Sequence, residues 1–141
     1  MQIFIFDNPL STALMLDSRR FYAQIREAKI IFKWCTMIRN GEGDRWRNQP
    51  LVRMYIDHMD WLNLYIELFE TVKRKDIERS NEINRKMLSI TPNWHCEEYY
   101  NQMKRRLYTK NKNYYKMWSE LGESYNNWYW VDNKWKIYNQ K

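Results

Sequence analysis

The sequence is short of the residues that build turns and crosslinks. It has three glycines, three prolines and two cysteines in 141 residues. So few turn-forming residues argue against an all-β protein, which needs many tight turns. The two cysteines, Cys35 and Cys96, are too few for a disulfide framework, and this scarcity is typical of a reducing, intracellular compartment. The composition therefore favours a helical protein that works inside a cell.

Long apolar runs and several common site motifs are also missing. No segment approaches the roughly 18 consecutive apolar residues of a membrane span, and residues 1–7 lack the basic region of a signal peptide. There is no glycine-rich phosphate loop, and His58 and His95 lie too far apart in the sequence to resemble a zinc motif. We therefore expect no membrane, no metal and no cofactor.

Apolar and basic residues are present in quantity. Hydrophobic residues make up 44% of the chain and aromatic residues 17%, which argues against disorder. The length fits one domain that spans residues 1–141. A net charge of +7 favours a polyanionic partner, although ordinary soluble proteins also carry an excess of this size.

Helical periodicity governs most of the chain. Apolar residues recur every three or four positions from Phe21 to Cys35, and this long helix should end at Asn40. Residues 1–6 should be extended and buried. Further helices are expected over residues 12–17 with Ser11 as cap, from Pro50 as a second long helix, and over 73–87, 97–108 and 112–121.

The C-terminal segment has a different character. Aromatic residues flank Asp132-Asn133, which favours either a small hairpin or an irregular aromatic strap over the helices. The predicted fold class is all-α: a compact single domain with two long helices, shorter C-terminal helices and this aromatic strap or hairpin.

Three groups of charged residues are candidates for function. On the first long helix, residues seven apart share a face, so Arg20 lies over Glu27 and Arg19 over Arg26. This places one carboxylate among arginines, as work on a phosphate backbone would require. The same charges also fit the solvated face of an ordinary amphipathic helix.

The other two groups are basic and aromatic. Residues 101–118 contain no acid, and basic and aromatic side chains alternate there in the way that nucleic-acid contacts use. The basic ones are Lys104, Arg105, Arg106, Lys110, Lys112 and Lys116. Arg45-Trp46-Arg47 precedes a helix N-terminus, which attracts anions. Core aromatics with solubilising lysines, and ordinary loop charges, remain alternatives.

Without a metal or a catalytic triad, a backbone amine is a plausible nucleophile. A free α-amino group has a pKa of about 7.7–8.0, against about 10.4 for a lysine side chain. A sizeable fraction is therefore neutral near neutral pH and can attack a sugar carbon to form a Schiff base.

The order of several motifs resembles the pyrimidine-dimer DNA glycosylase family, which includes phage endonuclease V and bacterial relatives. The matching segments are Leu16–Glu27 with Phe32, Arg45–Leu51, Ile56–Leu62, Pro92-Asn93-Trp94 and the aromatic residues from Trp128. The resemblance implies a compact helical glycosylase with AP-lyase activity.

The resemblance also implies roles for particular residues. The N-terminal amine attacks C1′ of a damaged nucleotide, and because Gln2 is bulky this amine would belong to a retained Met1. Glu27 would assist the reaction, and Arg19, Arg20 and Arg26 would hold phosphates. The expected partner is double-stranded DNA with a damaged or modified base, bound by a monomer. The resemblance to a phage enzyme also suggests a protein that a phage encodes and that works in the cytoplasm of a bacterial host. A non-catalytic DNA-binding module and a protein-interaction factor on the same fold are the competing hypotheses.

Overall fold

The computed structural model describes residues 1–139. In chain order it contains α1 (Pro9–Met15), α2 (Ser18–Arg39), α3 (Pro50–Tyr55), α4 (Met59–Lys73), α5 (Ile77–Ser89), α6 (Glu97–Lys110), the 3₁₀ helix η1 (Lys116–Leu121), β1 (Asn126–Val131) and β2 (Lys134–Asn139). Helices dominate this part of the chain, so the predicted all-α class is confirmed. No helix within residues 1–139 has both the length and the apolar character that a membrane crossing requires.

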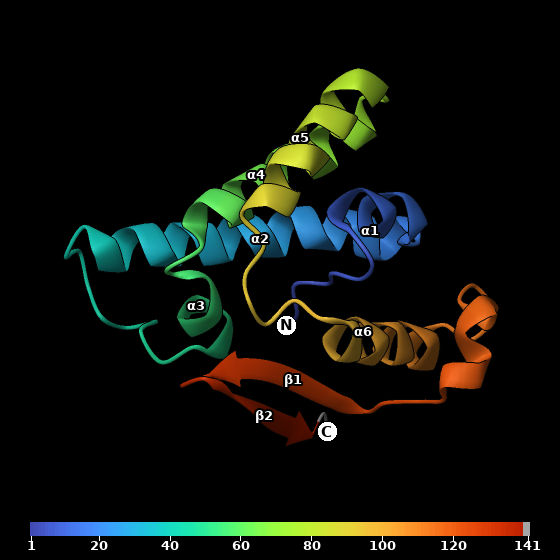
Figure 1. Cartoon of the computed structure of the whole chain (residues 1–141). Helices are drawn as coiled ribbons and strands as arrows, with labels where there is room; N and C mark the ends of the chain where they lie inside the picture. Colours follow the sequence, from blue (N-terminus) through green and yellow to red (C-terminus); the bar gives the residue numbers. More distant parts are fainter. Residues whose placement is uncertain (140–141) are drawn as a thin grey trace.

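Helix α2 organises the molecule. It crosses the middle of the structure, with α4 and α5 on one side and α6 with the hairpin on the other (Figure 1). Its buried residues follow the predicted helical spacing and include Phe21, Ile25, Ala28 and Cys35. The helix is capped by Asn40, as predicted.

The chain enters the fold as an extended segment. Residues 2–6 are buried and belong to no helix or strand, which confirms the prediction for them, whereas Met1 is exposed. The helix expected over 12–17 begins earlier, at Pro9, because the Asn8 side chain accepts a hydrogen bond from the Ser11 N–H at 2.8 Å. Asn8 is therefore the N-cap of this helix, and the prediction that Ser11 caps it is wrong.

The second long helix that we expected from Pro50 is divided in two. Helix α3 ends at Tyr55 and α4 begins at Met59, and between them His58 has a φ of −134°, outside the helical region. Aromatic packing nevertheless continues across the break, since Tyr55 stacks on Trp61 and Trp61 stacks on Tyr65. The continuous pattern of apolar residues predicts one helix, but in the structure these residues lie on two helices, α3 and α4.

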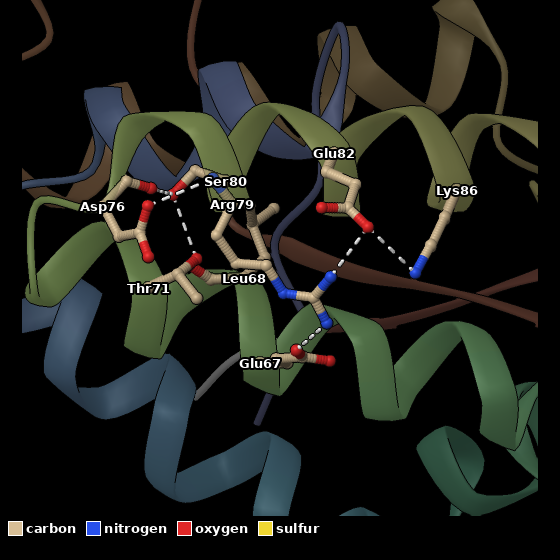
Figure 2. A network of polar contacts seen from close by, with 8 residues as sticks. All are labelled: Glu67, Leu68, Thr71, Asp76, Arg79, Ser80, Glu82 and Lys86. Carbon is tan, nitrogen blue, oxygen red and sulfur yellow. Dashed lines mark hydrogen bonds and ion pairs between the residues drawn. The ribbon is translucent and has the colours of Figure 1, made fainter.

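Helices α4 and α5 form an antiparallel pair joined by polar contacts (Figure 2). Arg79 of α5 bridges Glu67 of α4 and Glu82 of its own helix, while the Thr71 and Ser80 hydroxyls meet in a buried contact at 3.0 Å. The charged amphipathic helix expected over 73–87 is thus confirmed, but it begins at Ile77, where Asp76 caps it.

The C-terminal segment forms a hairpin, which is one of the two structures predicted for it. Strands β1 and β2 pair antiparallel, and both turn residues, Asp132 and Asn133, have positive φ, as a two-residue type I′ turn requires. Helix α3 packs against β1, and Arg53 pairs with Asp132 at the turn. The helix expected over 112–121 is instead the short 3₁₀ helix η1.

Candidate active site

A pocket of about 320 Å³ lies beside the N-terminus, between α2, α6 and β1. Among the described residues that line it, Glu27 is the single acidic one. The cationic ones are Arg19, Arg20, Arg106 and Lys110, and the amide side chains are Gln2, Gln24 and Asn127. Met1 lines the same pocket. The structure thus brings together five of the ten residues predicted for the site: Met1, Glu27, Arg19, Arg20 and Arg106.

One buried glutamine holds the N-terminal segment against α2. The Gln24 carboxamide oxygen accepts a hydrogen bond from the Phe4 N–H at 2.7 Å, and its nitrogen donates to the Gln2 carbonyl at 2.9 Å. The Tyr65 hydroxyl from α4 donates to the Phe4 carbonyl at 2.7 Å. These contacts satisfy backbone groups of a buried segment that has no strand partner.

A second clamp acts on Met1 from the other end of the chain. The Tyr129 hydroxyl of β1 donates to the Met1 carbonyl at 2.9 Å. The Met1 residue is therefore held between α2 and the hairpin by its carbonyl, although the residue as a whole remains 45% exposed. Because the carbonyl of the same residue is held, the Met1 amine has little conformational freedom. Such fixed placement favours the reaction of a nucleophile.

Glu27 lines the same pocket as this amine, and the charges of the two groups interact. Burial raises the pKa of the Glu27 carboxyl, while the charged N-terminal amine and the Gln2 N–H act in the opposite direction. Gln24 also donates to the Glu27 carboxylate at 3.2 Å. A partly buried carboxyl with a raised pKa, in the same pocket as an amine, is suited to general acid–base catalysis.

Arg20 is oriented by a buried contact between α2 and the segment before η1. Asp17, the residue that precedes α2, accepts from Arg20 Nη1 at 3.2 and 3.3 Å. Tyr115 donates its hydroxyl proton to the Asp17 carboxylate and accepts from the Asp17 N–H at 2.9 Å. Burial and this carboxylate raise the pKa of Tyr115, so the hydroxyl keeps its proton as a donor.

Removing that hydroxyl should weaken the fold measurably. Tyr115→Phe leaves the buried Asp17 N–H without its partner and removes one of the two donors to the Asp17 carboxylate, so we expect the free energy of unfolding to fall by about 2 kcal/mol. Urea denaturation measures this change. The exposed Tyr125, whose hydroxyl donates to Glu123, provides the control, and Tyr125→Phe should cost no more than about 0.5 kcal/mol. Equal effects of the two substitutions would contradict the structural role of Tyr115.

Two cations reach the pocket from α6. Arg106 is buried and donates through Nη1 to the Ser124 carbonyl at 3.1 Å. Lys110 lies one turn further along α6. Desolvation lowers the pKa of Lys110, and the positive charges of Arg106 and Arg20 lower it further. Lys110 belongs to the predicted basic run but not to the predicted site residues. Its spacing of four from Arg106 places both side chains on one face of the helix, and this spacing could have identified it.

The remaining predicted DNA contacts lie outside the pocket lining. Arg26 is exposed on α2 and acts on Glu27 through its charge. Lys104 pairs with Asp7 at 2.7 Å, and Arg105 donates to the Leu121 carbonyl at 2.7 Å. These roles in DNA binding stay predictions.

Arg45 and Arg47 occupy the loop between α2 and α3. The Arg45 guanidinium lies over the Trp46 ring at 4.8 Å, and Trp46 stacks on Trp34 of α2. Arg47 pairs with Asp44 at 2.6 Å and lines a second pocket of about 390 Å³. Both arginines are exposed, and their contact with DNA also stays a prediction.

The histidines do not form a metal centre. Within residues 1–139, no group of three or more His, Cys, Asp or Glu side chains is placed to hold a metal ion. His95 instead packs among the rings of Trp61, Trp94 and Tyr100, and burial lowers its pKa to about 3. This histidine is neutral at physiological pH and belongs to the aromatic core.

Comparison with known proteins identifies the family of this chain. A family model described as pyrimidine dimer DNA glycosylase matches residues 1–81, more than half of the chain. The chain belongs to the pyrimidine dimer DNA glycosylase family. Searches of curated proteins and of solved structures found no match.

Membership in the pyrimidine dimer DNA glycosylase family indicates DNA as the substrate and repair of damaged pyrimidines as the process. The matched part includes Met1, Glu27 and the arginines of α2. Arg106, Lys110 and Asn127 lie beyond it, on α6 and β1. The pocket is therefore completed by the part of the chain that the family model does not describe.

Proposed function

We propose that this chain is a DNA glycosylase with AP-lyase activity, in which the Met1 amine is the nucleophile and Glu27 the acid–base group. The observation that carries the proposal is the placement of Met1 and Glu27 in one pocket whose other charges are cationic. The substrate would be double-stranded DNA with a damaged or modified pyrimidine, bound inside the cell by a monomer whose 141 residues form one domain.

The first half of the reaction releases the base. The lone pair of the neutral amine forms a bond to C1′ as the bond between C1′ and the base breaks. The electron pair of that bond leaves with the base, which takes up a proton. The attacking nitrogen loses a proton, and the C1′–O4′ bond then opens with protonation of O4′, which leaves a C1′=N iminium, the Schiff base. Glu27, with its raised pKa, can give and take protons in these steps.

The second half cuts the strand. A base removes a proton from C2′ of the Schiff base, the electrons move to form a C2′=C3′ double bond, and the C3′–O bond breaks with departure of the 3′ phosphate. Water then hydrolyses the iminium and frees the amine. Glu27 is the one carboxylate among the described lining residues and is our candidate for this proton transfer.

The cations would hold the DNA backbone around the extruded nucleotide. Arg19, Arg20, Arg106 and Lys110 line the same pocket as the amine and would supply positive charge for the flanking phosphates. Extrusion of the nucleotide gives the amine access to C1′, which is shielded inside a duplex.

Borohydride trapping tests the proposal. Untagged protein is mixed with duplex DNA carrying an abasic site, and separately with DNA carrying a thymine dimer. Borohydride reduces a Schiff base to a stable amine, so we expect a covalent adduct on both DNAs that peptide mapping assigns to Met1. An adduct on a lysine would contradict the nucleophile. Intact binding with no adduct on either DNA would support a non-catalytic DNA-binding module instead.

A further inference from the structure

An apolar groove of about 310 Å³ lies between α1, the end of α4 and the start of α5. Its side chains include Leu10 and Leu14 from α1, Val72 from α4 and Ile77 from α5. Helices α4 and α5 lie on the side of α2 that faces away from α6 and the hairpin (Figure 1). No described residue lines both this groove and the active-site pocket, so the proposed DNA chemistry leaves the apolar groove unexplained.

Two large apolar residues of the groove remain in contact with solvent. Leu14 is 63% exposed, and Ile77 is 73% exposed. Ile77 is the first residue of α5, a position where an acidic side chain would stabilise the helix. Single exposed hydrophobic residues are common on protein surfaces, but a concave cluster of them is typical of a binding site. The groove therefore has the character of a surface that another molecule covers.

Three consecutive cations, Lys73, Arg74 and Lys75, stand at the end of α4, and all three are exposed. Lys75 lines the groove. Within residues 1–139, none of the three forms an ion pair. The acidic residue of the described lining, Asp76, is engaged as the cap of α5, where it accepts from the Arg79 N–H at 3.1 Å. The rim of the groove thus carries an excess of positive charge.

Lys75 holds its position at a conformational cost. Its φ is 61°, in the left-handed region that disfavours residues with a Cβ. Its N–H bonds to the Val72 carbonyl and the Asp76 N–H bonds to the Thr71 carbonyl, both at 3.0 Å. This is the Schellman arrangement, in which the left-handed position is usually glycine. The stability of the fold therefore does not account for a lysine at this position.

We propose that the apolar groove binds a peptide segment of another protein that combines acidic with large apolar side chains. Its apolar side chains would pack between Leu14 and Ile77, and its carboxylates would lie against Lys75 and the two preceding cations. A second copy of this chain is a poor occupant, because it carries the same cations and a net charge of +7. The contact would tether the protein to an acidic partner without blocking the active-site pocket.

Fluorescence anisotropy with labelled peptides tests the proposal on the full chain. The probes are fluorescein-labelled glutamate decamers with two leucines placed two, three or four positions apart, which covers extended and helical peptides. We expect at least one probe to bind with a Kd of about 100 μM or tighter. The same decamer with serine for leucine, or with lysine for glutamate, should bind about tenfold more weakly or worse. Saturation with duplex DNA should change the peptide affinity by no more than about twofold.

Substitutions in the groove identify where the probe binds. Leu14→Ser and Ile77→Ser each remove an exposed apolar side chain and should weaken binding about tenfold. Leu88→Ser is the matched control, since Leu88 is a 51% exposed leucine of α5 outside the groove, and its affinity should equal that of the wild type. Lys75→Gly should weaken binding about threefold and raise the midpoint of urea unfolding, because glycine relieves the left-handed strain. A purely structural role of Lys75 would lower both.

The outcomes separate this surface from the glycosylase site. Absence of binding by every leucine-containing probe overturns the proposal, as does equal binding of the serine probe. Displacement of the probe by DNA would place it in the active-site pocket, and equal affinities of the wild type, Leu14→Ser and Ile77→Ser would place it elsewhere; both results overturn the proposal. A dimer of the protein alone that Ile77→Ser abolishes in sedimentation would make a second copy the occupant instead. The groove variants should cleave abasic DNA as the wild type does.

Discussion

Replacing Glu27 by glutamine is expected to lower strand cleavage by a factor of about 10²–10⁴, the range for loss of a general acid–base group. The amide keeps the size of the side chain and an oxygen that can still accept from the Gln2 N–H. It removes one negative charge from a cationic pocket, so DNA affinity should be equal or higher. Cleavage of abasic duplex on denaturing gels and fluorescence anisotropy with the same duplex measure the two effects separately.

The control for this substitution is Glu78→Gln, which makes the same chemical change on the exposed surface of α5. It should leave cleavage and binding at wild-type values. Wild-type cleavage by the Glu27 variant would remove Glu27 from the mechanism. A parallel loss of cleavage and of binding would assign it to DNA binding or folding instead.

One extra glycine ahead of Met1 is expected to reduce Schiff-base trapping at least a hundredfold. The extension retains a free α-amine but moves it by about 3.3–3.6 Å, and a displacement of about 1 Å can already cost a factor of 10². It cannot be absorbed by a shift of the chain, because Gln24 and Tyr129 hold Gln2 and Met1 by their carbonyls. Trapping on abasic DNA, quantified by gel, gives the result.

A glycine added after Lys141 makes the same addition at the other terminus and should leave trapping unchanged. Efficient trapping by the extended protein, with the adduct on its new first residue, would show that position is not what makes the amine reactive. Efficient trapping at an internal lysine would show that the nucleophile lies elsewhere.

Much of the helical framework could be predicted because its signals are local. The apolar spacing of α2, its end at Asn40 and the hairpin around Asp132-Asn133 each depend on a few neighbouring residues. The break between α3 and α4 could not be predicted in this way. Tyr55 and Trp61 pack against each other across it, so the apolar pattern continues although the backbone leaves the helix.

Some residues of the pocket could be predicted from the sequence, and others could not. Met1 and Glu27 could be proposed from chemistry and resemblance, and the structure brings them together. Gln24 was missed, although it is a polar residue in the apolar seam of α2, where a buried partner is to be expected. Asn127 gave no local signal, because only tertiary packing brings β1 to the N-terminus.

The hydrogen bond from Tyr129 to the Met1 carbonyl joins residues 128 positions apart, and this has a consequence for synthesis of the chain. Tyr129 is synthesised 128 residues after Met1, the residue that it holds. Closing so long a loop is entropically costly, so this contact depends on prior folding of the segments between them. A chain that lacks β1 therefore carries a Met1 amine that is not positioned, and the site is completed only when β1 has folded against the N-terminal segment.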